Sequence, residues 1–126
     1  MRARGSRGAA IVDFVLVLAI LVPVFLGILQ LALVLLVRNT LAAAASEGAR
    51  YAATLDRDEA DGEARTRAQI HGALADRYAD EVDAHPVLVA GAPGVEVTVH
   101  AVVPALGLGG PGISLTVTGH AVEEEP

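Results

Sequence analysis

The most prominent feature of the hydrophobic pattern is a long apolar run near the N-terminus. Residues 14–37 form a stretch of 24 residues without a charge, and Gln30 is the only strongly polar side chain among them. A helix of this length would measure about 36 Å at roughly 1.5 Å per residue. The hydrocarbon core of a bilayer is about 30 Å thick, so the run can cross it with some tilt. We therefore predict a transmembrane helix over residues 9–37, after a basic leader over residues 1–8.

Beyond the apolar run, small residues recur at helical spacing, which predicts that the helix continues outside the membrane. They return at steps of three and four residues and form one narrow face, on which another helix could pack closely. This face consists of Leu41, Ala45, Gly48, Ala49 and Ala52. The alternative is an alanine-rich extension without a packing partner.

A second helix is predicted after a polar segment, within an exported helical region over residues 38–85. Asp56 or Asp58 can cap its start, and Glu59 stands three residues after Asp56, as in a capping box. We expect an apolar stripe on this helix to cover a sheet formed by the rest of the chain. The stripe consists of Ile70, Ala73, Leu74, Arg77 and Tyr78.

The pattern changes to a period of two in a β region, residues 86–126, which ends in an acidic tail. Residues 95–103 and 113–121 alternate apolar and polar side chains, as half-buried strands do. A register that puts the apolar side chains of both strands on one face follows from this pattern. It pairs Val103 with Ile113, Thr98 with Thr118 and Glu96 with His120.

A third short strand is predicted at residues 87–90, between Pro86 and a turn at residues 91–94. The apolar, Gly-rich loop 104–112 would be either a contact tip in an assembly or a flexible hairpin loop. Together the elements predict an α+β fold. It would have a long N-terminal transmembrane helix that continues into a helical region, then a small antiparallel hairpin or three-stranded sheet, in a pilin-like arrangement.

Charges are distributed unevenly along the chain, whose net charge is −6. Residues 1–38 carry four arginines and one acid, a net charge of +3, whereas residues 39–126 carry five arginines and fourteen acids, a net charge of −9. Such an acidic bulk argues against nucleic acid as a partner, because that binding depends on cations that neutralise phosphates. The chain has no cysteine, which excludes disulfides and thiolate metal sites.

The arginines also predict how the membrane helix is oriented. Arg2, Arg4 and Arg7 precede the apolar run, whereas Arg38 and Arg50 follow it and are succeeded by acids. The positive-inside rule then places the N-terminus in the cytoplasm and the C-terminal part outside, in the periplasm or the extracellular space.

No pattern in the sequence is typical of catalysis or of metal binding. The four histidines lack ligand spacing, since a zinc site needs three or four convergent ligands. They are His71, His85, His100 and His120. The acidic stretch 56–62 does not fit a calcium loop, because Arg67 stands where the bidentate Glu belongs. We expect a non-enzymatic protein without a cofactor or a small-molecule substrate.

An acid, Asp13, stands directly before the apolar run and has two interpretations. A carboxylate in the first turn of a helix interacts favourably with the positive end of the helix dipole. Near the headgroups it also avoids most of the cost of burying a charge at the bilayer centre, about 2.5–3.5 kcal/mol on insertion scales. The second interpretation depends on spacing: Asp13 is the fifth residue counted from Ala9, and Gly8 precedes Ala9 after a short basic segment.

This combination of leader, small residue, acid and apolar run resembles a type IV prepilin processing site. In that family a membrane-embedded aspartyl peptidase cuts after the small residue on the cytoplasmic face, which here is the bond between Gly8 and Ala9. The resemblance implies that the helix then packs with others in a pilus or a pilus-like assembly. Phe14, Pro23 and Gly27 belong to this assembly helix. The family usually has glutamate as the acid; the aspartate here keeps the carboxylate but is shorter.

A wider stretch, residues 4–54, resembles the TadE-like segment of tight-adherence pilus assembly proteins. That segment combines an R-G start, a V-E-F motif, an apolar span with a proline, N-x-L and E-G-A-R-x-A. The matching residues here include Val12, Asp13, Phe14, Pro23, Arg38, Asn39, Leu41, Glu47, Gly48, Ala49 and Arg50. The resemblance implies a minor pilin or pseudopilin of a tight-adherence (Flp-type) pilus or secretion system in the bacterial cytoplasmic membrane. It implies as partners membrane lipid, a prepilin peptidase, other pilins or pseudopilins, and pilus assembly proteins.

Two alternatives stay open. An unprocessed single-pass envelope protein, TadG-like in its anchoring only, would support secretion or adhesion. A secretory signal cleaved near Ala45 would release a soluble protein, although the hydrophobic region of such signals has only about 7–15 residues.

Overall fold

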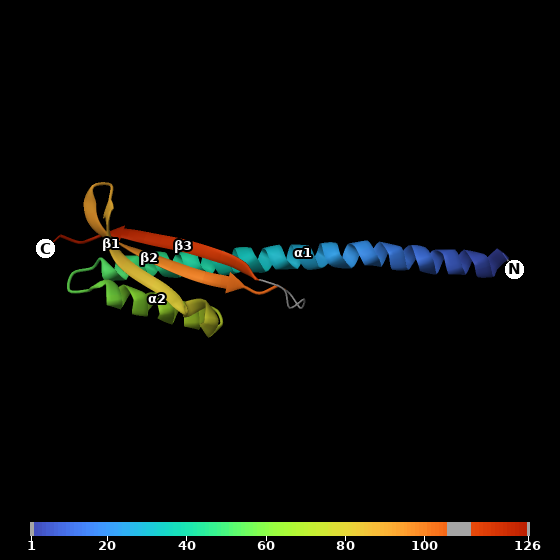
Figure 1. Ribbon diagram of the computed structural model, residues 1–126, viewed down its shortest axis with the longest axis horizontal. Coiled ribbons are helices and arrows are strands. Elements are labelled where there is room, and N and C mark those ends of the chain that lie inside the picture. Colours follow the sequence, from blue (N-terminus) through green and yellow to red (C-terminus); the bar gives the residue numbers. More distant parts are fainter. Residues whose placement is uncertain (1, 106–111, 126) are drawn as a thin grey trace. The chain divides into compact units, whose positions relative to one another are not determined.

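The computed structural model describes residues 2–105 and 112–125, with side chains from Gly5 onward (Figure 1). The chain divides into two compact units, Met1–Leu33 and Val34–Pro126. The α+β fold predicted from the sequence is confirmed, with a three-stranded sheet. Residues 106–111, most of the predicted Gly-rich loop, lie outside the described residues. The elements in chain order are α1 (Arg2–Ala52), α2 (Glu59–Ala73), the 3₁₀ helix η1 (Asp76–Ala79), β1 (Glu81–Val89), β2 (Ala92–Val103) and β3 (Ile113–Val122).

The unit Met1–Leu33 consists of the N-terminal part of α1, and its apolar side chains are exposed. Every described side chain from Gly5 to Leu29 is exposed. α1 is long and apolar enough to span a membrane, as the apolar run predicts. Pro23 lies inside α1, where its ring removes one backbone hydrogen bond. Membrane helices tolerate such a proline.

In the unit Val34–Pro126, the last turns of α1 form one side of a compact core. Leu41, Ala45 and Ala49 have no exposed surface, and Gly48 and Ala52 are also buried. The predicted packing face is therefore confirmed, and its partners are α2 and β3 of the same unit. An alanine-rich extension without a partner is excluded.

A complete capping box starts α2. Oδ1 of Asp58 accepts a hydrogen bond from N of Asp61 at 2.9 Å, and Oδ2 of Asp61 accepts one from N of Asp58 at 3.1 Å. The alternative cap, Asp56 with Glu59 as its partner, is therefore wrong. Asp56 has a φ of 64° in the turn before α2, a left-handed conformation that aspartate tolerates better than most residues.

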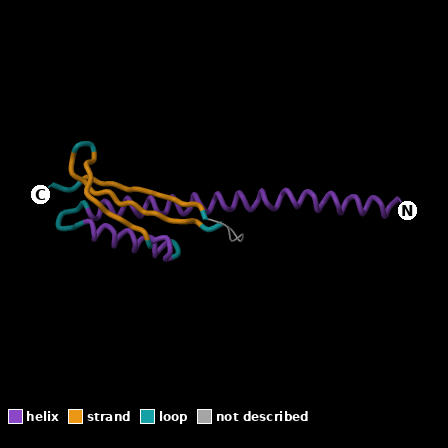
Figure 2. Tube along the Cα trace, viewed as in Figure 1, coloured by secondary structure: helices purple, strands orange, loops and turns teal. Residues whose placement is uncertain are grey.

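The strands form one antiparallel sheet in the order β1-β2-β3 (Figure 2). The predicted register is confirmed: Val103 pairs with Ile113, Thr98 with Thr118 and Glu96 with His120. One face of β2 belongs to the core, as the alternating pattern predicts. Its buried side chains are Val95, Val97, Val99, Ala101 and Val103.

β1 is longer than the strand predicted at residues 87–90. It begins at Glu81 and contains Pro86, which the sequence pattern placed before the strand. The proline is accommodated because β1 is an edge strand, where the position of the missing N–H can face away from the sheet. The turn consists of Ala90 and Gly91. A turn at residues 91–94 is therefore wrong, because pairing of the strands extends to Val89 and Ala92.

Two polar side chains of α2 form hydrogen bonds with the backbone of β1. Oε1 of Glu63 accepts a hydrogen bond from N of Ala84 at 3.0 Å, and Nη2 of Arg67 donates one to O of Val82 at 3.0 Å. Glu63 and Arg67 also form an ion pair at 3.3 Å. Free backbone groups at a sheet edge can pair with other chains, so these contacts protect the β1 edge.

The apolar stripe predicted on the second helix is only partly formed. Ile70 is fully buried, but α2 ends at Ala73, which is exposed, and Tyr78 is buried from η1. The sheet is covered by α1 as well: Gly119 of β3 lies against the backbone of Ala45. The stripe fails because the helix stops before its last predicted members.

Candidate processing site and assembly helix

The predicted processing residues lie within α1. Gly8, Ala9 and Asp13 are all helical and exposed. A side chain added at Gly8 would meet nothing within 4 Å. Ala9 and Asp13 are four residues apart, so they share one face of the helix, about 6 Å apart along its axis. The bond between Gly8 and Ala9 is therefore on the surface of its unit, close to the carboxylate.

The start of α1 excludes one interpretation of Asp13. α1 begins at Arg2 and has no acid in its first turn. Asp13 lies three turns further along, whereas the interaction of a charge with the helix dipole falls off within the first turn. Asp13 is therefore not a first-turn acid of α1 as the structure describes it. A helix that began at Ala9 would bring the carboxylate close to its amino end.

The residues of the predicted assembly helix lie on an exposed apolar surface. Phe14 is 64% exposed, and a Cβ added at Gly27 would meet nothing within 4 Å. Pro23 lies between them in the same helix. The large apolar side chains from Ile11 to Leu29 are 38–71% exposed. A helix that is apolar all round requires lipid or other helices around it.

The first part of the family motif lies where the apolar run ends, within the unit Val34–Pro126. Arg38 and Asn39 are exposed, whereas Leu41 is fully buried. Thr40 turns its hydroxyl back to the helix, and Oγ1 donates a hydrogen bond to O of Leu36 at 2.9 Å. The motif therefore lies in the region where α1 changes from an exposed to a packed helix, directly after the buried Val37.

The E-G-A-R part of the motif joins α1 to α2. Glu47 forms an ion pair with Arg65 of α2 at 3.5 Å, with both side chains partly exposed. Gly48 lies at the crossing of the two helices, and Ala49 has no exposed surface. Arg50 is exposed, and within the described part of the chain its guanidinium forms no ion pair. Three of the four motif residues thus contribute to packing.

Sequence reasoning missed three residues that make this packing possible. Gly62 and Thr66 of α2 face Gly48, and Gly119 of β3 faces α1. Thr66 is fully buried, and its Oγ1 donates a hydrogen bond to O of Gly62 at 2.8 Å. A glycine inside a helix or strand pattern is a signal of close backbone approach, and that signal could have identified both glycines.

Three of the histidines lie beside a single polar partner. Nδ1 of His100 is 2.9 Å from Oγ1 of Thr116. Nδ1 of His71 is 2.6 Å from Oδ1 of Asp76, and Nε2 of His85 is 3.2 Å from Oε1 of Glu96. Over residues 2–105 and 112–125, no three His, Asp or Glu side chains are grouped so that they could hold a metal ion. These pairs are therefore surface contacts.

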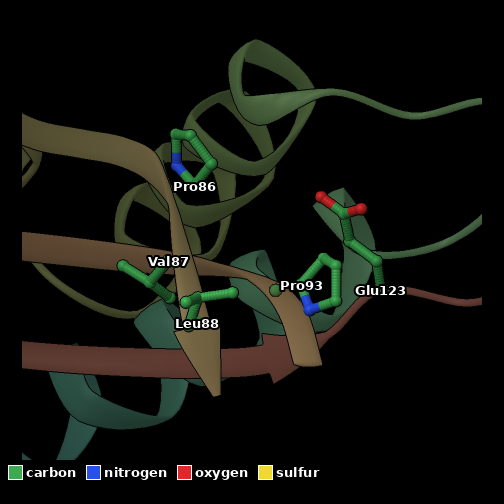
Figure 3. Close-up of a pocket in the computed structure, with 6 residues that line it drawn as sticks. Pro86, Val87, Leu88, Pro93 and Glu123 are labelled. Carbon is green, nitrogen blue, oxygen red and sulfur yellow. The ribbon is translucent and has the colours of Figure 1, made fainter. Parts of the chain in front are cut away.

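A shallow hollow lies at the end of the β1–β2 hairpin (Figure 3). Its volume is about 340 Å³, and Glu123 is the one ionisable residue in its lining. The other lining residues are Pro86, Val87, Leu88, Pro93 and Gly94. Catalysis usually requires several convergent polar groups, and this hollow does not provide them.

Comparison with known proteins concerns the N-terminal segment. Residues 8–50, which are 43 of the 126 residues, match the family described as TadE-like protein. The matched segment contains the predicted processing residues, the apolar run and the E-G-A-R motif, so the resemblance inferred from the sequence is confirmed there. No curated protein and no solved structure matches the chain.

Proposed function

We propose, from the TadE-like segment at residues 8–50, that the chain is a minor pilin or pseudopilin of a tight-adherence (Flp-type) pilus or secretion system. It is non-enzymatic and is processed between Gly8 and Ala9. One observation carries the proposal. Asp13 is an exposed carboxylate four residues after Ala9, and directly after it the helix surface is apolar on every side.

The proposed location is the bacterial cytoplasmic membrane, with α1 as a single span. Support comes from the length of the uncharged run, residues 14–37, which suits the bilayer core. The arginines of the leader favour a cytoplasmic N-terminus. The unit Val34–Pro126 is then outside, in the periplasm or the extracellular space.

Processing removes the leader and with it Arg2, Arg4 and Arg7. Two glycines, Gly5 and Gly8, precede the proposed cleavage site, and each costs a helix about 1 kcal/mol relative to alanine. The two glycines therefore weaken the helix next to the proposed cleavage site, which favours unwinding there by a peptidase. Cleavage leaves a free amine at Ala9, in place of a peptide group.

The proposed assembly step pairs that amine with the Asp13 carboxylate of a neighbouring subunit. An ionisable residue in a membrane segment is by default a functional hypothesis that names its partner, and here the partner is the amine of Ala9. The exposed apolar side chains of α1 then pack on the helices of other pilins or pilus assembly proteins, with membrane lipid covering the rest. Neither nucleic acid nor a small-molecule substrate has a part in this proposal.

The experiment compares Asp13→Ala with Asp13→Glu in cells that have the tight-adherence system. The readout is the amount of this chain that co-purifies with pilin after crosslinking in the membrane, divided by its total amount in the membrane. Asp13→Ala should lower this ratio several-fold, because it removes the charge that pairs with the amine. In Asp13→Glu the ratio should stay close to that of the wild-type chain, because glutamate keeps the carboxylate.

An unchanged ratio in Asp13→Ala would contradict the assembly role. The chain would then be the unprocessed envelope protein of the alternative interpretation. A similar fall of the ratio in Asp13→Ala and Asp13→Glu would also contradict the proposal, because a carboxylate at this position would then not be enough for the partner to bind.

A further inference from the structure

The end of the sheet formed by β2 and β3 extends beyond β1. Glu81, the first residue of β1, pairs with His100 of β2. The residues that follow in β2 pair with β3, and the last pair is Val103 with Ile113. Figure 1 shows both strands continuing past the start of β1. We call this protruding end, defined by Val102, Val103 and Ile113, the sheet tip.

The sheet tip exposes large apolar side chains. Val102 is 55% exposed and Ile113 is 45% exposed, whereas Val103 is fully buried. Between Glu96 and Glu123 the sequence has no Asp, Glu, Lys or Arg. Val103 pairs with Ile113, and neighbouring residues of a strand point to opposite faces, so Val102 and Ile113 lie on opposite faces of the sheet. The uncharged end therefore presents an exposed apolar side chain on each of its two faces.

Two contacts establish the direction of β3 along the last turns of α1. Gly119 lies against the backbone of Ala45 and Ser46. N of Glu124 donates a hydrogen bond to O of Ala53 at 2.9 Å. Residue numbers rise together in the two elements, so β3 and this part of α1 run in the same direction.

These contacts bring the sheet tip level with the end of the apolar run. From Gly119 back to Ile113, β3 covers about 20 Å at roughly 3.3 Å per residue. The same distance along α1 corresponds to about 13 residues at 1.5 Å each. Counted back from Ser46, this length leads to within about one turn of Val37, where the uncharged run ends.

We propose that the sheet tip lies in the interfacial layer of the same membrane, with Val102 and Ile113 among the lipid headgroups. The inference rests on the proposed membrane anchoring of α1. The uncharged run ends at Val37, which is fully buried within its unit, so the folded unit begins where the bilayer ends. Arg38 follows and is exposed, where it favours the headgroup phosphates.

The charges around the sheet tip favour lipid as its occupant. The carboxylates at the start of β1 are those of Asp80 and Glu81, both exposed; Glu81 lies opposite His100, about 7 Å from the level of Val102. The apolar side chains can enter the interface while the Glu81 carboxylate stays at its water-facing side, and Asp80 precedes β1 and is exposed to water. The sheet tip itself carries no charge with which to select a protein partner.

The absence of cysteine in the chain allows a direct test by single-cysteine labelling. Ile113→Cys and Val122→Cys form a matched pair, because both residues lie on β3 and their exposed fractions are 45% and 48%. Phe25→Cys, within the apolar run, reports on membrane anchoring. Each full-length variant is labelled with an environment-sensitive fluorophore and reconstituted at low density into vesicles of phosphatidylcholine and phosphatidylglycerol. Quenching by brominated lipid is compared with quenching by aqueous iodide.

We expect lipid to quench the label at Ile113→Cys several-fold more than the label at Val122→Cys, with the opposite order for iodide. Equal quenching at these two positions, together with lipid quenching at Phe25→Cys, would overturn the inference and leave the membrane anchoring intact. Absence of lipid quenching at Phe25→Cys would instead overturn the anchoring on which the inference rests. At low protein density, contact with a second copy of the chain does not shield the label at Ile113→Cys from iodide.

Discussion

Gly48 of α1 and Gly62 of α2 meet backbone to backbone where the two helices cross. A Cβ built on Gly48 would lie 2.7 Å from O of Gly62, and one built on Gly62 would lie 3.0 Å from O of Gly48. Thr66 fills the space beside them and is fully buried. This contact explains in physical terms why the E-G-A-R motif has a glycine: a larger residue would separate α1 from α2.

Gly48→Ala should therefore destabilise the unit Val34–Pro126. The added methyl group overlaps Oγ1 of Thr66 and O of Gly62, and overpacking of this kind costs about 1–3 kcal/mol. The measurement is the urea concentration at half-unfolding of the full chain in nanodiscs, followed through the circular dichroism of the sheet.

Gly72→Ala is the matched control for this substitution. Gly72 is also helical, but a Cβ there would meet nothing within 4 Å. It should be neutral or stabilising by up to about 1 kcal/mol, because alanine favours the helix. If Gly48→Ala behaved like Gly72→Ala, the close helix crossing would be wrong.

The turn between β1 and β2 contains a residue that is unfavourable for its conformation. Ala90 has a φ of 50° and is followed by Gly91 with a φ of 84°. Two-residue hairpin turns with positive φ at both positions prefer Asn-Gly, and a left-handed conformation costs an ordinary residue about 1–2 kcal/mol. Ala90→Asn should therefore raise the free energy of unfolding by up to about 1 kcal/mol in the same urea experiment.

Gly91→Ala tests the same turn in the opposite direction. A Cβ at Gly91 would meet nothing within 4 Å, so any change in stability comes from the backbone conformation alone. We expect a loss of about 1–2 kcal/mol. A stabilising Gly91→Ala or a destabilising Ala90→Asn would contradict the positive φ values at this turn.

Sequence reasoning succeeded where the controlling interactions are local or periodic. The uncharged run identified the apolar part of α1, and the alternation around Val103 and Ile113 gave both strands and their register. The spacing of Leu41, Ala45 and Ala49 located the packed face of α1. In each case the pattern along the chain reflects one continuous face of one element.

It failed where an element is determined by contacts with a distant segment. Pro86 looked like a strand boundary, but β1 continues through it because it is an edge strand whose backbone meets α2. Asp56 and Asp58 were equivalent as caps until the side chain of Asp61 completed the box with Asp58. The role of Gly62 could not be inferred from the spacing of apolar residues, because it depends on where α1 and α2 cross.

For the candidate site, the sequence placed Gly8 in a leader before the helix, whereas in the structure Gly8, Ala9 and Asp13 all lie within α1 and are exposed. The start of α1 at Arg2 then removed the interpretation of Asp13 as a first-turn acid, which no pattern in the sequence could decide. These observations do not test cleavage between Gly8 and Ala9, which stays a prediction. It depends on a peptidase that recognises the leader, not on contacts within the chain.

Mass spectrometry of the N-terminus tests the central claim most directly. The chain is purified from membranes of cells with and without an active prepilin peptidase, alongside Gly8→Val as a variant with an altered cleavage site. We predict that the wild-type chain begins at Ala9 only when the peptidase is active, and that Gly8→Val retains residues 1–8 in both cells. A wild-type chain that still carries residues 1–8 in cells with the active peptidase would contradict the account.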